Sequence, residues 1–190
     1  MRKKKIFAAA VILGLAVCMP GGCGGNQPQN GDTSGGESVQ IANPMRDITE
    51  GESHKLCNHS LGVPENAKNA AWSAIETGSS DNSGTLVQLN FDLDNNSYTA
   101  RAQKTDNPDA DISGMYYEWS AKNIMSLTNW KQIKGTYYRW FDKSSSEGYA
   151  DLCTWYDAET GISYSLSVTA DDLDGFDLQA IVEYLYAPEK

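Results

Sequence analysis

Residues 162–169 alternate between apolar and polar side chains with a period of two. Isoleucine, tyrosine, leucine and valine occupy the even positions, and serines occupy positions 163, 165 and 167. Because successive side chains of a strand point to opposite faces of a sheet, this pattern predicts a strand with one buried face and one solvated face. Such a strand is typical of an antiparallel sheet whose apolar face is covered by a second layer.

Five further segments are predicted to be strands on similar grounds: 71–76, 85–93, 97–103, 135–142 and 149–156. The second and third are separated by Asp94-Asn95-Asn96, which is typical of a tight hairpin turn. The polar residues 104–114 are expected to form a loop.

A helix is predicted at each end of the folded part. Thr49 followed by Glu52 is typical of a capping box, so the first helix should begin there and end near Asn58, with Leu56 and Cys57 facing inward. The second is predicted over 175–186, with Asp174 as N-cap and one apolar stripe made of Leu178, Ile181, Val182 and Leu185. Residues 43–190 are therefore predicted to be a single α+β globular domain, an antiparallel β-meander sheet packed by a short N-terminal and a C-terminal helix in a two-layer sandwich.

Residues 1–22 are typical of a lipoprotein signal peptide. A cationic start precedes an apolar run over 6–19, which is shorter than the about 20 residues that a spanning helix needs. The end of this segment resembles the processing site of bacterial lipoproteins, in which a cysteine becomes the lipidated first residue. Cys23 follows the small residue Gly22, so we expect lipidation there. Cys18 is the alternative, and plain secretion or an uncleaved anchor stays open.

Residues 23–42 are rich in Gly, Asn, Gln and Ser and are predicted to be a flexible tether. An acylated Cys23, carrying palmitate or a similar chain, would hold the domain at the extracytoplasmic face of the bacterial cell membrane. The chain has 15 Lys and Arg against 25 Asp and Glu, a net charge of −10. Because so acidic a surface repels phosphate backbones, nucleic acid is not an expected partner.

Several short motifs recur, in this order, in one group of bacterial proteins: Asn43-Pro44-Met45, Gly62-Val63-Pro64-Glu65, Asp111-Ile112-Ser113-Gly114, Cys153-Thr154-Trp155-Tyr156 and the run over 161–168. With them, residues 43–187 resemble the domain-of-unknown-function family 4367, found in lipoproteins and anti-sigma-type membrane proteins of Gram-positive bacteria. The resemblance implies an envelope protein and brings no activity with it. The sequence departs from the family at His54, Cys57 and His59, and in its aromatic stretch over 116–141.

That aromatic stretch supplies the candidate binding residues, which are Tyr117, Trp119, Tyr138 and Trp140. Exposed aromatic side chains with polar tips suit sugar rings or a protein partner. Adjacent residues such as Tyr137 and Tyr138 must point to opposite faces of a strand, so they cannot share one core. The alternative is that these residues serve packing, since Tyr and Trp favour strands in any case.

Cys57 and Cys153 are the two cysteines left after lipidation. Outside the cytoplasm such a pair can form a disulfide, which is one hypothesis, and two buried thiols is the other. His54, Cys57 and His59 are too few and too unevenly spaced for a zinc tetrahedron, so we predict no metal site and no cofactor.

The chain contains neither Gly-x-Ser-x-Gly nor His-Glu-x-x-His, so it has no recognisable hydrolase motif. The sequence favours a lipid-anchored, non-catalytic domain that binds or senses an envelope protein or a glycan. The alternative is a small cell-envelope hydrolase that uses a pair of carboxylates, for which 25 acidic residues offer many combinations.

Overall fold

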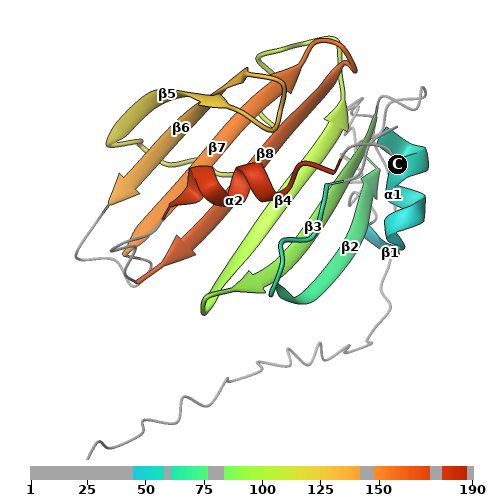
Figure 1. The fold of residues 1–190 in the computed structure, drawn as a ribbon, viewed down its shortest axis with the longest axis horizontal. Coiled ribbons are helices and arrows are strands. Elements are labelled where there is room, and N and C mark those ends of the chain that lie inside the picture. The colour runs from blue at the N-terminus through green and yellow to red at the C-terminus, as the bar shows by residue number, and fades with distance from the viewer. Residues whose placement is uncertain (1–44, 58–60, 77–83, 142–147, 172–176, 188–190) are drawn as a thin grey trace, which may run out of the picture. The chain divides into compact units, whose positions relative to one another are not determined.

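The computed structural model describes residues 45–57, 61–76, 84–141, 148–171 and 177–187. In these ranges eight strands form one antiparallel sheet, in the order β1-β2-β3-β4-β8-β7-β6-β5, and two short helices accompany it (Figure 1). The elements in chain order are β1 (Met45–Ile48), α1 (Glu50–Cys57), β2 (Lys68–Glu76), β3 (Thr85–Leu93), β4 (Asn96–Lys104), β5 (Ala121–Leu127), β6 (Ile133–Phe141), β7 (Tyr149–Asp157), β8 (Ile162–Ala170) and α2 (Leu178–Tyr184).

The predicted α+β fold class is confirmed, but the meander is interrupted once. Strands β1 to β4 form one run of neighbours and β5 to β8 form another. The two runs are joined by the pairing of β4 with β8, in which Ala100 lies opposite Leu166. Residues 105–120 carry the chain from β4 to β5 at the far edge of the sheet. Strands β1 and β5, which form the two edges, were not predicted.

The turn and the first cap are as the sequence predicts. Asp94 and Asn95 have φ angles of 50° and 67°, the left-handed pair that a two-residue hairpin turn requires. Before α1, the Thr49 N–H donates to Glu52 Oε2 at 2.7 Å, and the Glu52 N–H donates to Thr49 Oγ1 at 3.2 Å. These reciprocal bonds form the capping box. The Thr49 N–H and the Thr49 hydroxyl, which both donate to Glu52 Oε2, lower the pKa of Glu52. Cys57 is buried, as expected, while Leu56 is half-buried.

The predicted N-cap of the second helix is wrong. Helix α2 begins at Leu178, and the side chain of Asp177 accepts the N–H of Ala180 at 3.1 Å. An N-cap residue must directly precede the first helical residue, so Asp177 takes the position, and Asp174 lies outside the described residues. The apolar stripe of this helix is confirmed, since all four of its predicted members are buried.

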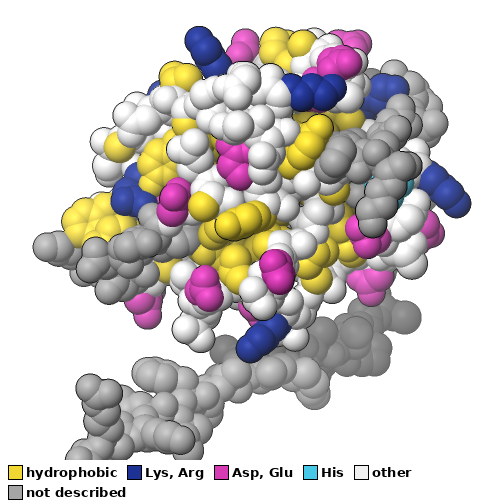
Figure 2. Space-filling view, viewed as in Figure 1, with side chains coloured by type: hydrophobic (Ala, Val, Ile, Leu, Met, Phe, Trp, Pro, Cys, Tyr) yellow, Lys and Arg dark blue, Asp and Glu magenta, His cyan; other side chains and the backbone are white. Residues whose placement is uncertain are grey.

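Both helices pack against the same face of the sheet, which we call the helix face. Helix α1 contacts β2, β3 and β4, and α2 contacts β5 and β7. In Figure 1, α2 lies in front of the strands. Figure 2 gives the same view with side chains and shows a hydrophobic group near the middle, with acidic residues around it.

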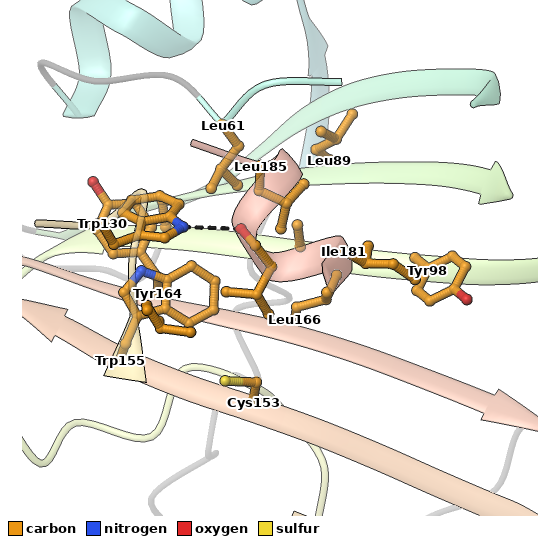
Figure 3. Packing of buried hydrophobic residues seen from close by; sticks show 14 of the residues in the cluster. Leu61, Leu89, Tyr98, Trp130, Cys153, Trp155, Tyr164, Leu166, Ile181 and Leu185 are labelled. Atoms are coloured by element: carbon orange, nitrogen blue, oxygen red, sulfur yellow. Dashed lines mark hydrogen bonds between the residues drawn. The ribbon is translucent and has the colours of Figure 1, made fainter. Parts of the chain in front are cut away.

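Trp130, in the turn between β5 and β6, has the largest of the fully buried side chains in the described residues. Its side chain is 1% exposed, and its Nε1 donates to the Val182 carbonyl oxygen at 2.9 Å (Figure 3). Its ring lies 5.0 Å from Trp155 and 4.8 Å from Tyr164, measured between centroids. The hydrogen bond therefore ties α2 to this turn from inside the core. The opposite side of the sheet, which carries the serines of β8, is called the loop face below.

Candidate functional site

Residues 105–120 cross the loop face and are held there by Arg101 on β4. Its Nη1 donates to the carbonyl oxygens of Ile112 and Ser113 at 3.2 and 2.6 Å, and its Nε donates to Gln88 Oε1 at 2.9 Å. Burial lowers the pKa of Arg101, and Tyr116 and Asp111 act in the opposite direction. Ile112 and Ser113 are themselves buried, so the middle of this segment packs against the sheet.

The four candidate aromatic residues lie together on the loop face. The centroid of Tyr117 is 4.8 Å from that of Trp140 and 5.5 Å from that of Trp119, and Trp119 lies 5.5 Å from Tyr138. All four are half-buried. Two come from the crossing segment and two from β6, and we call the group the aromatic cluster.

The neighbour of Tyr138 in β6 points to the other side of the sheet, as expected. The hydroxyl of Tyr137 donates to Asp151 Oδ2 at 2.6 Å on the helix face, where Arg139 Nε donates to Asp151 Oδ1 at 2.7 Å. Burial, together with Asp151, raises the pKa of Tyr137. Asp151 is fully buried, so its charge is neutralised inside the protein by Arg139.

A pocket of about 710 Å³ adjoins the aromatic cluster. Trp119 and Tyr138 belong to its lining, and the crossing segment adds the stretch from Pro108 to Asp111. Strands β6, β7 and β8 supply the hydroxyl-bearing side chains of its floor, which are Thr136, Thr154, Tyr156 and Ser163. We call this the loop-face pocket. Its volume lies within the roughly 300–1,000 Å³ usual for pockets that bind small molecules.

Two lysines belong to the same pocket. Lys122 Nζ lies 5.3 Å from the centroid of the Tyr138 ring, and Lys134 is exposed on β6. Among the described residues neither forms an ion pair. The carboxylates of the pocket are Asp109 and Asp111, both from the crossing segment. Asp111 Oδ1 already accepts from the N–H and the hydroxyl of Ser113, at 2.9 and 2.6 Å.

The floor of the pocket includes a buried hydroxyl that has no hydrogen-bond partner among the described residues. Ser163 is 2% exposed, and its Oγ is unpaired. A buried polar group in this state costs about 1–3 kcal/mol of stability.

The two cysteines of the folded domain are free and buried, so the disulfide hypothesis is corrected. Cys57 Sγ donates to the Ala102 carbonyl oxygen at 3.7 Å, over β4, whereas Cys153 lies on β7 with its Sγ 3.9 Å from Met125 Sδ. Strand β8 lies between β4 and β7, so the two thiols contact different strands. A disulfide would require the Cα atoms of the two cysteines to lie about 4.4–6.8 Å apart.

Several predicted features lie outside the described residues: the signal peptide 1–22, the tether 23–42, Cys18, Cys23 and His59. In the ranges that are described, no three His, Cys, Asp or Glu side chains gather where a metal ion could bind. Those ranges also contain no helix with the length and apolar character needed to cross a membrane.

Sequence reasoning missed the floor of the pocket and the lysines beside it. Thr136, Thr154 and Ser163 come from three strands, and only the pairing register, in which Thr136 lies opposite Thr154, places them together. The serine alternation of β8 was the available signal, but the solvated face that it predicted is wrong: Ser163, Ser165 and Ser167 are all buried on the loop face. The residues of β6 and β7 that share this face depend on a register that the pattern alone does not give.

Comparisons with protein-family models, with curated proteins and with solved structures gave no match to this chain. The resemblance noted in the sequence therefore stays a prediction, and any function has to be argued from the site itself.

Proposed function

We propose that this chain is a lipid-anchored, non-catalytic domain that binds or senses a component of the bacterial cell envelope, with the aromatic cluster as its contact surface. One observation carries the proposal: Tyr117 and Trp119 of the crossing segment meet Tyr138 and Trp140 of β6 on the face opposite the helices. Half-buried aromatic side chains that adjoin a pocket supply a large contact area together with polar tips, which suits a protein or glycan partner.

The anchor can be tested separately from the binding surface. We expect Cys23→Ser to abolish incorporation of labelled palmitate and to release the protein from the membrane fraction. The matched control is Cys18→Ser, which should leave both properties unchanged. Loss of palmitate in Cys18→Ser alone would move the lipidation site to Cys18, and retention in both variants would overturn the anchor.

The contact surface is tested by crosslinking the protein on intact cells and identifying bound molecules by mass spectrometry. Tyr138→Ala and Trp140→Ala should each reduce the recovered partner, with little change in melting temperature. Tyr184→Ala is the matched control, because Tyr184 is 63% exposed and belongs to α2 on the helix face. Undiminished recovery in both loop-face variants would refute the contact surface. A large loss of stability in both would assign these residues to packing.

A further inference from the structure

We infer that the loop-face pocket binds a saccharide that carries a carboxylate group. This inference rests on the proposed function, because it names the chemistry of the ligand at the same surface. It is drawn from three features of the pocket: its aromatic wall, its hydroxyl-bearing floor, and two lysines that form no ion pair within the described part of the chain.

The wall and the floor together match the two kinds of surface on a sugar ring. A pyranose has apolar C–H faces, which pack well against aromatic rings, and hydroxyl groups around its edge. Trp119 and Tyr138 supply rings at the wall, while Thr136 and Thr154 supply hydroxyls at the floor. A purely apolar ligand would leave these hydroxyls without partners, and that would cost binding free energy.

Ser163 adds to the polar character of the floor. It belongs to the lining of the pocket, and its buried Oγ has no hydrogen-bond partner among the described residues. Asp109, also in the lining, can accept further hydrogen bonds from sugar hydroxyls.

The lysines indicate that the ligand carries negative charge. The chain as a whole is strongly acidic, with a net charge of −10, whereas in this pocket Lys122 and Lys134 balance the two carboxylates of Asp109 and Asp111. The contact of Lys122 with the Tyr138 ring keeps its ammonium beside the aromatic wall. A carboxylate on the sugar would complete the ion pairs that these two lysines do not make with the described part of the chain.

The test uses two pairs of probes, and each pair differs mainly in charge. The first pair is the disaccharide GlcNAc-MurNAc and chitobiose, which lacks the lactyl carboxylate. The second is trigalacturonate and its methyl ester. Each probe is titrated into the mature lipidated protein in detergent micelles, and binding is followed by tryptophan fluorescence and saturation-transfer NMR. We expect at least one acidic probe to bind about tenfold more tightly than its neutral counterpart, with an affinity that falls as salt is added.

Variants then assign the binding to the pocket. Combining Lys122→Ala with Lys134→Ala should remove the preference for the acidic probe over its neutral counterpart. Lys55→Ala, an exposed position on α1, is the matched control. Thr154→Val should weaken both probes about threefold to tenfold, because it removes a hydroxyl of the half-buried floor. This variant is expected to fold, because valine keeps the branched shape of threonine and favours strands.

The outcomes separate this inference from the proposed function. If no acidic probe binds more tightly than its neutral counterpart, or if the double lysine variant keeps the preference, the inference is overturned. The proposed function still stands in that case, provided that capture on cells depends on Tyr138 and Trp140. If the acidic probe binds as expected but capture on cells is unaffected by those two residues, the contact surface fails and the saccharide pocket stands.

Discussion

Arg101 Nη1 donates a hydrogen bond of 2.6 Å to the carbonyl oxygen of Ser113, and this bond fixes the crossing segment on the loop face. The next residue is Gly114, whose φ of +67° places it in the left-handed region. A β-carbon on Gly114 would lie 2.5 Å from the same Nη1 atom. The Asp-Ile-Ser-Gly motif of the sequence therefore has a structural role: it brings the backbone close enough for Arg101 to anchor one wall of the pocket.

Gly114→Ala should destabilise the domain by about 1–3 kcal/mol, because alanine adds both left-handed strain and a clash with Arg101. Urea unfolding followed by tryptophan fluorescence measures the change. Gly51→Ala is the matched control, since that helical position has open space around it, and alanine there should be neutral or stabilising by up to about 1 kcal/mol. Equal stability of the two variants would contradict the anchoring role of the motif.

Local pattern was sufficient for most of the fold. Strand β3 has its predicted bounds of 85–93, because its alternation is clean and a strong turn follows it. The capping box of Thr49 and Glu52 fixed the start of α1 for the same kind of local reason. The edge strands were not predicted because an edge strand buries few side chains. In β5, Asn123 and Ile124 are both exposed, so neither face of this strand shows a row of buried apolar residues.

The candidate site could be predicted in part. The aromatic residues stood out by composition, and the rule that adjacent strand residues face opposite ways separated Tyr138 from Tyr137. The position of Arg101 beneath Ser113 could not be predicted, because it depends on where a long connection crosses the sheet. The pairing of β4 with β8, on which the whole pocket depends, joins segments far apart in the chain and leaves no local signal.

Trp130→Phe should lower the free energy of unfolding by about 1–3 kcal/mol. Phenylalanine keeps an aromatic ring in the core, but it removes the Nε1–H that donates to the Val182 carbonyl oxygen, which would then be buried without this donor. Thermal and urea unfolding measure the loss. Trp119→Phe, on the loop face, is the comparison and should change stability by no more than about 0.5 kcal/mol. If the two variants lost equal stability, the hydrogen bond from Trp130 to α2 would not contribute to the stability of the domain.

The buried thiols should make the domain sensitive to alkali. Burial raises the pKa of Cys57 to about 11 and of Cys153 to about 12, from an ordinary value of 9.0. The unfolded chain therefore releases these protons at lower pH than the folded chain, so their stabilising effect is complete below about pH 9 and is lost as the pH rises toward 12. Urea unfolding from pH 8 to pH 11 should show this loss. It should be smaller in a variant that combines Cys57→Ala with Cys153→Ala.

Iodoacetamide labelling, mapped by mass spectrometry, should leave both sites unmodified in the folded protein at pH 8 and modify both in denaturant without reductant. A disulfide between them would leave both unmodified in denaturant as well.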